Sequence, residues 1–382
     1  MQHHPADSAL VDAILREIHA AGGRLTFARY MELALYHPWY GYYLSGERIG
    51  KAGDFFTSVS VGPLFGRIWA RQFLKCKAEL GDPPDFEIVE FGGHRGQMRD
   101  DVLREAPALK YRIVEARDPM PARFTGCAFS NEFLDALPVH RVKVVRGEWQ
   151  ELYVAAAEQN AEHRTSNAEY RSEEERIRGR GLSVGAAPGH PAPFAAETGP
   201  LSTPRLAEAL CGLPADLMEG YTTEVNLRAL EWIEEVARRL LRGLVFTVDY
   251  GYERPDYFAP HRREGTLLCT YRHTRNADPF RHVGEQDITA HVEFSSLIEH
   301  GRRLGLEPIL FTDQSRFLLE AGQDLVAEIA ARDAGRLSPE RNMIHQLAHP
   351  SLMGRTFKVL VQRKHDRSGE KPCMTGNSLR GS

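Results

Sequence analysis

The chain has 382 residues, a formal net charge of −4, and 42% hydrophobic and 26% charged residues, an ordinary globular composition. This length allows one large domain or two modest ones, and the weakly acidic balance gives no electrostatic reason to expect nucleic acid or an anionic membrane as a partner. The five cysteines are scattered without a CxxC pair, which argues against a zinc ribbon or a disulfide framework.

The amino-terminal residues do not look like a targeting segment. They carry Asp7, Asp12 and Glu17 and lack the basic start and long apolar core of a signal peptide. No apolar run approaches the length of a membrane span. We therefore expect a cytoplasmic protein without a membrane partner.

Helices are predicted first along the chain. An amphipathic helix is expected over residues 8–21, and a second over 27–35 with Thr26 as its cap. An aromatic segment and a glycine-containing loop follow, and they lead into a helix over about 63–80. We expect residues 1–80 to form a helical extension and lid, lying over the carboxyl ends of the strands that follow.

The most informative stretch is residues 86–104, FEIVEFGGHRGQMRDDVLR. A short apolar strand meets the turn Gly92-Gly93-His94-Arg95-Gly96, and a helix with apolar Met98, Val102 and Leu103 follows. Strand, glycine turn and helix is the pattern with which an open α/β sheet builds a nucleotide site at the carboxyl end of a strand. The next apolar run ends at Glu115, where a carboxylate can accept hydrogen bonds from both hydroxyls of a ribose.

The turn does not suit a phosphate. A GxxxxGK[ST] motif is absent, and the spacing of Gly92 and Gly96 misses GxGxxG, which disfavours a P-loop NTPase and a nucleotide-dependent oxidoreductase. Glu90, in the strand just before the turn, argues for a cationic or neutral ligand. S-adenosylmethionine (SAM) has a ribose, an adenine, an amino acid and a sulfonium but no phosphate, so it fits. A purely structural turn is the competing interpretation.

After Glu115 the chain is unusually short. Only residues 116–126 precede the next apolar run at 127–129, too few for the usual helix and third strand. A hairpin is expected over 141–154. Residues 155–204 are rich in Ala, Glu, Arg, Gly and Pro, and we predict a flexible insertion there.

The carboxyl-terminal half continues the α/β pattern. We expect a long helix within 214–242 that ends at Gly243, and a buried parallel strand over 244–252. The remaining predicted elements are a short strand within 265–271, a helix over 294–304, strands over 306–313 and 357–363, and a disordered tail over 364–382. The prediction is thus an α/β protein with a doubly wound, mostly parallel sheet and one continuous domain over 81–363.

Several segments together resemble the MidA-like family of SAM-dependent methyltransferases, in the family's order. They are LALYHPWYGYY, GKAGDFFTS, IVEFGGHRGQMRDDVLR, SNEFLDALPVHR, VDYGYERPDYF and GEQDITAHVEFSSL. The resemblance implies a Rossmann-like class I methyltransferase fold, here with an amino-terminal helical extension and a shortened region after the second strand. Mitochondrial members of that family methylate an arginine in a subunit of respiratory complex I. The family turn usually has the pattern G-P-G-R-G, so His94 is a departure.

The resemblance assigns the cofactor residues. Gly92, Gly93 and Gly96 would lie beside the amino-acid part of SAM, Glu115 would hold the ribose, and Glu90 would meet the amino group. In the amino-terminal loop, Asp54, Thr57 and Ser58 either close over SAM or form a simple helix cap.

Catalysis on an arginine needs carboxylates, because a guanidinium stays protonated in water with a pKa above about 12. Glu132 and Asp135, just after a strand, are the first catalytic candidates, together with Asp54. The alternative is a structural role, in which Asp135 caps the following turn and Glu132 hydrogen-bonds to backbone.

Further residues are candidates for an acceptor channel. Asp249 and Tyr250 end a strand on the expected active face, and Asp287 and His291 stand at a predicted helix start. A single pair such as the last two is more often a capping contact than a catalytic dyad. No His, Asp or Glu cluster has the spacing of metal ligands.

The leading hypothesis is a SAM-dependent methyltransferase acting on a protein, at an arginine of a respiratory complex subunit or of another acceptor. The alternative is a methyltransferase-fold protein that has lost turnover and serves as an assembly or binding factor. His94 and the missing segment favour the second, and the acidic residues favour the first. The sequence does not set the oligomeric state.

Overall fold

The computed structural model describes residues 5–44, 58–115, 118–157, 192–211, 213, 218–333, 338–348 and 357–366. The chain forms two compact units, each assembled from separated segments. The antiparallel-sheet unit comprises residues 1–60, 133–230 and 250–296, and the parallel-sheet unit comprises 61–132, 231–249 and 297–382. These units differ from the predicted sequential division at residues 80 and 363, because strands distant in sequence pair with one another.

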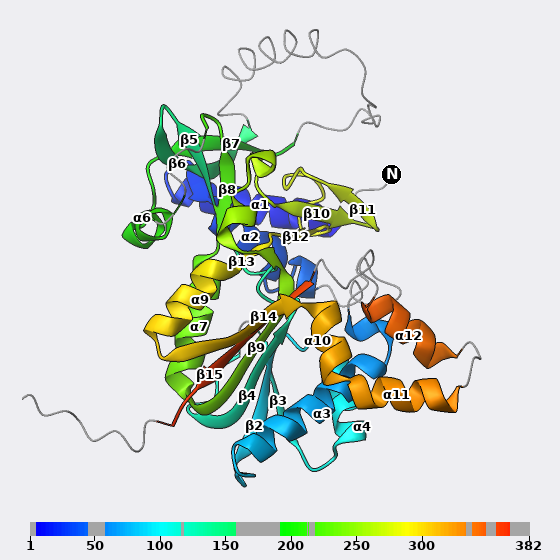
Figure 1. The fold of residues 1–382 in the computed structure, drawn as a ribbon. Helices are drawn as coiled ribbons and strands as arrows, with labels where there is room; N and C mark the ends of the chain where they lie inside the picture. The colour runs from blue at the N-terminus through cyan, green and yellow to red at the C-terminus, as the bar shows by residue number, and fades with distance from the viewer. Residues whose placement is uncertain are drawn as a thin grey trace, which may run out of the picture. The chain divides into compact units, whose positions relative to one another are not determined.

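The parallel-sheet unit is built on one twisted sheet with the strand order β14-β15-β9-β4-β2-β3 (Figure 1). The central strands β3, β2, β4 and β9 run parallel, whereas β14 and β15 pair antiparallel. The strands are β2 (Phe86–Phe91), β3 (Lys110–Val114), β4 (Phe124–Asn131), β9 (Leu240–Tyr252), β14 (Leu306–Asp313) and β15 (Phe357–Lys364).

In that sheet β3 is the outermost strand of the described order, and the chain returns directly to β4 on the other side of β2. The predicted doubly wound sheet and its shortened region after the second strand are therefore confirmed. A dozen residues or so are needed for a helical crossover to a further parallel strand, and the segment after Glu115 does not supply both a helix and a strand.

Helices cover both faces of this sheet, which is why its central strands β2, β4 and β9 are buried along most of their length. On one face Trp69 of α3 (Leu64–Glu79) packs on Phe129 and Phe246, with ring centroids 4.6 and 5.2 Å apart. On the same side lie α4 (Gln97–Glu105), α10 (Gln314–Ala321), α11 (Gln323–Arg332) and α12 (Pro339–Ala348). The last three helices were not predicted.

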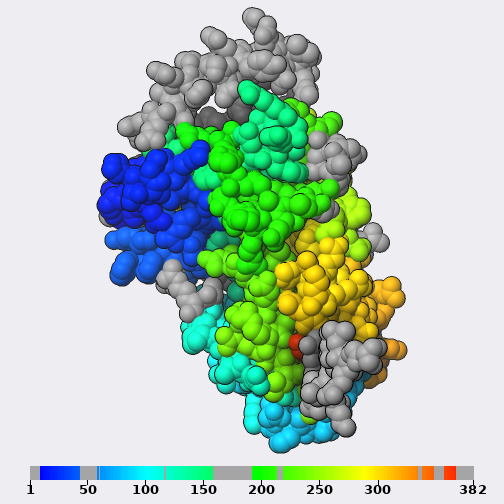
Figure 2. Space-filling model, turned by 90° about the vertical axis from the view of Figure 1, so that its left-hand side faces the viewer, coloured from blue at the N-terminus to red at the C-terminus, as the bar shows by residue number. Residues whose placement is uncertain are grey.

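The opposite face carries α7 (Leu227–Arg239) and α9 (Phe294–Arg303). There Trp232 packs edge-on against Phe91, with ring centroids 5.4 Å apart. A hydrogen bond between His300 Nε2 and Glu234 Oε1 at 2.7 Å joins the two helices. Figure 2 shows the surface that they form, in lime and yellow.

The antiparallel-sheet unit contains a five-stranded sheet of order β1-β6-β5-β8, with β7 also paired to β6. Helices α1 (Pro5–Ala20) and α2 (Phe27–Tyr36) pack on it, and Thr26 Oγ1 caps α2 by accepting from the Arg29 amide at 3.2 Å. The strands are β1 (Arg24–Thr26), β5 (His140–Val145), β6 (Glu148–Ala156), β7 (Phe194–Gly199) and β8 (Thr222–Val225).

The predicted hairpin is present as β5 and β6. The predicted insertion over 155–204 is partly wrong, because its far end forms β7 and buries Phe194 in the unit's core. Smaller elements complete the unit. They are η1 (Tyr42–Leu44), η2 (Val59–Val61, whose last residue is assigned to the other unit), α6 (Pro204–Leu210), α8 (Arg254–Tyr257), η4 (Pro260–Arg262), β10 (Leu268–Tyr271), β11 (Thr274–Asn276), β12 (Asp287–Thr289) and β13 (Val292–Glu293).

Gly243 corrects a further prediction. It does not end a helix, since α7 stops at Arg239 and Gly243 lies inside β9 with φ of +143°. A Cβ atom there would stand 1.8 Å from the carbonyl oxygen of Gly126 on the neighbouring strand. The glycine is required by close strand contact rather than by a helix end. Separately, the described helices include none long and apolar enough to cross a membrane.

Candidate functional site

The glycine turn joins β2 to α4 at the carboxyl end of the parallel strands. Three of its residues, Gly92, His94 and Gly96, adopt left-handed backbone conformations with φ of 73°, 47° and 75°. A Cβ atom at Gly93 would stand 2.7 Å from Glu90 Oε2 and 2.9 Å from Ile113 Cγ2. The turn therefore presents bare backbone beside a carboxylate.

Glu90 is buried beneath this turn. Burial is the largest effect on its carboxyl, whose pKa is raised to about 8. The nearby Tyr111 hydroxyl lowers this pKa, Glu115 raises it, and Arg99 lowers it by a smaller amount. Neither Glu90 Oε2 nor the Tyr111 hydroxyl has a partner at hydrogen-bond geometry among the described residues, and both atoms are buried. A buried acceptor of this kind costs free energy unless a ligand or water satisfies it.

Glu115 follows β3 at the same edge of the sheet. Burial raises the pKa of its carboxyl, the His94 backbone amide lowers it, and Asp118 raises it. Its own amide donates to Asp118 Oδ2 at 3.0 Å, which fixes the backbone after the strand. One carboxylate oxygen, Oε1, is buried without a partner among the described residues.

More unpartnered polar atoms continue this edge across the sheet. Ser130 of β4 and Thr247 of β9 are register partners, both are fully buried, and neither hydroxyl has a partner among the described residues. Asn131 Oδ1 is likewise unpartnered, although its Nδ2 donates to Glu132 Oε1 at 3.1 Å. Sequence analysis missed Tyr111, Ser130 and Asn131, since isolated polar residues in a strand carry no signal of their own.

Glu132 follows β4 with a left-handed φ of 52°, uncommon for a non-glycine residue. Its amide donates to the Val248 carbonyl at 2.9 Å, so the strained backbone is anchored on β9. Strain of this kind collects at functional sites, where surrounding structure holds it in place. The predicted position of Glu132 directly after a strand is thus observed.

In the antiparallel-sheet unit, the Asp135 side chain is buried at 6% exposure, and its carbonyl accepts from the Ala290 amide at 2.9 Å. Asp287 is also buried and accepts from the Tyr43 hydroxyl at 2.8 Å and from the Ile288 amide at 2.9 Å. The prediction that Asp287 starts a helix is wrong, because it lies in β12.

His291 lies between β12 and β13, not at a helix start as predicted. Its ring stacks on Tyr250 with centroids 6.2 Å apart and leans on Tyr252 at 5.3 Å. Burial lowers the pKa of His291 to about 4, and Arg262 and Arg275 lower it further, so the ring is neutral near pH 7. Its buried Nδ1 has no partner in the described part of the chain.

The remaining candidates divide between buried and undescribed positions. Ser58 and Asp249 are fully buried. Asp54 and Thr57 lie outside the described residues. Groups of three or more metal-ligating side chains are absent from the part of the chain that the structure describes.

The residues at the end of β2 and β3 fit the cofactor that the sequence predicted. Glu90 and Glu115 offer buried carboxylate oxygens without partners, which suit an amino group and ribose hydroxyls. The absence of a Cβ at Gly93 leaves space that a side chain would fill. A ligand with cationic and hydroxyl groups would satisfy these oxygens, whereas the oxygens of a phosphate are acceptors themselves and offer no donor to them.

Comparisons with known proteins agree with this cofactor. The Methyltransf_28 family model, described as S-adenosyl-L-methionine-dependent methyltransferase, matches residues 114–312. A COG1565 superfamily member from Burkholderia thailandensis, whose crystal structure contains S-adenosyl-homocysteine, is 30% identical with a TM-score of 0.76, and the match covers 95% of each chain.

Curated relatives are more distant in sequence. Protein arginine methyltransferase NDUFAF7, mitochondrial, of Rattus norvegicus is 24% identical over 440 residues, which is 98% of this chain and 90% of the relative. The Homo sapiens protein of the same name is 24% identical, over 90% of this chain and 81% of its own length.

These findings correct the predicted location and bear on the choice between an enzyme and a binding factor. The predicted cytoplasmic location is contradicted, because the names of the curated relatives place them in mitochondria. The alternative of a binding factor without turnover is not favoured. The resemblance to the MidA-like family is confirmed, and the chain belongs to the S-adenosyl-L-methionine-dependent methyltransferases that the matching family model describes, with SAM as its methyl donor.

Proposed function

We propose that this methyltransferase acts on an arginine side chain of a protein. The observation that carries the proposal is the similarity, over nearly the whole chain, to proteins named protein arginine methyltransferase. As acceptor we propose a subunit of a respiratory complex, which follows from the family resemblance alone.

The cofactor would be held in the parallel-sheet unit. Glu90 would meet its amino group and Glu115 its ribose, while the backbone of Gly92, Gly93 and Gly96 approaches the amino-acid part. When bound, SAM supplies a methyl group on a positively charged sulfur. Thr57 and Ser58 remain candidates for contacts that close over it.

The acceptor guanidinium needs acidic partners. Carboxylates bind a guanidinium through paired hydrogen bonds, which fixes its plane and orients one nitrogen toward the methyl group. As the carbon–nitrogen bond forms and the carbon–sulfur bond breaks, the nitrogen loses a proton, which a carboxylate accepts. We propose Glu132, Asp135 and Asp54 for these roles.

The support for Glu132 is its conformation. A non-glycine residue held at φ of 52° by a hydrogen bond to Val248 is placed by the fold rather than by its own preference. We further propose that Asp249, Tyr250, Asp287 and His291 line the acceptor channel, and the neutral His291 ring between tyrosines suits a flat cationic guest.

A labelling experiment tests the proposal. Extract from a deletion strain is incubated with tritiated SAM and purified wild-type protein, and the labelled product is hydrolysed for amino-acid analysis. Label in methylarginine of a single protein band is expected. Label in another amino acid would overturn the arginine assignment, and no label with wild-type protein that binds SAM would overturn a protein acceptor.

The carboxylates are tested in the same assay. Glu132→Gln and Asp135→Asn should lower incorporation about 100-fold or more, because general-base contributions are of that size, while SAM affinity stays within about twofold. Glu148→Gln, an exposed change on β6, is the matched control and should retain full activity.

A further inference from the structure

The parallel-sheet unit contains a cavity at the edge opposite the glycine turn. Its volume is about 230 Å³, and it lies where β9 begins and β15 ends. Val248, at the other edge, lies five positions along β9 from Gly243 in this cavity, which is about 16 Å of strand. The cavity is therefore distinct from the cofactor edge.

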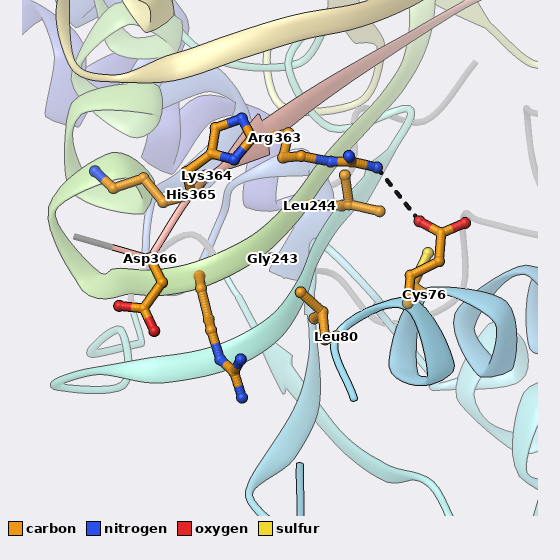
Figure 3. A pocket seen from close by; sticks show the side chains of 10 residues that line it. Cys76, Leu80, Gly243, Leu244, Arg363, Lys364, His365 and Asp366 are labelled. Carbon is orange, nitrogen blue, oxygen red and sulfur yellow. Dashed lines mark hydrogen bonds and ion pairs between the residues drawn. The ribbon is translucent and has the colours of Figure 1, made fainter. Parts of the chain in front are cut away.

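The floor of the cavity is apolar. It is formed by Leu80 at the end of α3, by Leu244 and Gly243 of β9, and by the buried Cys76. In Figure 3 the Arg363 guanidinium extends past Leu244 toward the end of the helix that carries Cys76. A ligand here would contact aliphatic carbon on one side and charged groups on the other.

Two arginines from different strands line this floor. Arg242 has no ion pair among the described residues, so all its N–H donors are free for a ligand. Arg363 contacts Glu79 through Nη2 alone at 3.3 Å, and both side chains are over 40% exposed, at 41% and 45%. A half-exposed pair of this kind contributes little free energy, so an anion can compete for Arg363.

The other charged groups that line the cavity either have protein partners already or are acidic. Lys364 Nζ donates to the carbonyl of Ala237, in the last turn of α7, at 2.8 Å and to that of Leu304, just after α9, at 3.3 Å. His365 pairs with Glu307 at 2.7 Å. The acids of the lining are Glu79 and Asp366. The permanently charged cations Arg242, Arg363 and Lys364 thus outnumber the two acids in the lining. The N–H donors that a ligand can reach are those of the two arginines.

We infer that this cavity binds a small organic phosphate monoester with an apolar body. Two guanidinium groups on separate strands offer more N–H donors than the two oxygens of one carboxylate can accept from. The three terminal oxygens of a phosphate monoester can accept hydrogen bonds from both guanidinium groups. The floor of Leu80, Leu244 and Cys76 accommodates the body, and the volume admits a group of about the size of a benzene ring rather than a large cofactor.

Calorimetry at low ionic strength with full-length protein tests the inference, using phenyl phosphate, benzoate and inorganic phosphate as probes. We expect phenyl phosphate to bind more tightly than the other two. Arg242→Gln should weaken its binding about 10- to 100-fold, the loss expected for charge-assisted hydrogen bonds. Arg316→Gln removes an exposed arginine paired with Glu320 and should leave binding unchanged.

Glu79→Gln provides a gain-of-binding test that does not depend on damaging the fold. It removes a competing acid and frees Arg363, so phenyl phosphate should bind about threefold more tightly or better. Absence of binding to the wild type, equal loss in Arg242→Gln and Arg316→Gln, or weaker binding in Glu79→Gln would each overturn the inference. SAM affinity, measured in parallel, should not change in any of these variants.

Discussion

The Glu90 carboxylate lies directly against the backbone of Gly93: a Cβ atom on Gly93 would stand 2.7 Å from Glu90 Oε2, closer than real Cβ contacts come. The carboxylate and the turn backbone thus enclose one space. A side chain at Gly93 would fill it and push the carboxylate aside.

Gly93→Val should therefore abolish measurable SAM binding in calorimetry. Gly81→Ala is the control, because Gly81 also precedes an element of this unit, has φ of 80°, and has open space around its Cβ position. That variant should lose about 1 kcal/mol of stability from backbone strain yet keep its affinity for SAM. Normal binding by Gly93→Val would place the cofactor elsewhere.

SAM affinity should depend on pH through Glu90. The carboxyl pKa of about 8 means that most Glu90 is protonated near neutral pH, whereas a cationic ligand binds the ionised form. Affinity is expected to rise up to about tenfold per pH unit between pH 6 and about 7, where an α-amino group with a pKa of about 7.7–8.0 is still mostly protonated. Glu90→Gln should give weak binding with a flat pH profile, and a steep profile in this variant would contradict the assignment.

The same group should affect folding stability. Its folded-state pKa lies above the ordinary value of 4.5, so its contribution to the free energy of unfolding is full below pH 4.5 and is lost as pH rises to about 8. Without ligand, Glu90→Gln should therefore be more stable than wild type at pH 8, by up to a few kcal/mol. Urea unfolding of both proteins at pH 5 and pH 8 measures this difference.

Glu115→Gln should weaken SAM and S-adenosyl-homocysteine alike, because the lost contact is to the ribose that both share. A loss of about 10- to 100-fold is expected for a charged acceptor of two hydroxyl groups. Glu87→Gln is the control, since Glu87 lies on β2 and pairs with Arg112 at 2.9 Å. An unchanged affinity in Glu115→Gln would exclude the ribose contact.

Glu151 should be the most sensitive carboxylate in the antiparallel-sheet unit. It is fully buried and accepts from His140 Nδ1 and from the Ser202 amide, both at 2.7 Å. Glu151→Ala should lower the free energy of unfolding by about 2–4 kcal/mol, because the half-buried His140 ring and the Ser202 amide lose their charged acceptor. Glu148→Ala, exposed on the same strand, should change it by less than about 0.5 kcal/mol, with tryptophan fluorescence and circular dichroism reporting unfolding in urea.

Residues 86–115 were predictable because their pattern is local. The period of the apolar residues and the glycines between them define β2, the turn and α4, and the tip of β3 follows from the next apolar run. The edge position of β3 was predictable too, since too few residues follow for another helix and strand. The same reasoning placed Glu90, Glu115 and Glu132 at strand ends.

Other features required the tertiary structure, because they depend on residues far apart in the chain. The five-stranded sheet pairs β1 with β6 and β8 with β5, and no local pattern encodes those pairings. The role of Gly243 became clear only from its contact with Gly126. Likewise, Ser130 and Thr247, whose buried hydroxyls have no partner among the described residues, are neighbours only through strand register. Sequence periodicity reports which side of an element is apolar, whereas the partner on that side is decided by packing.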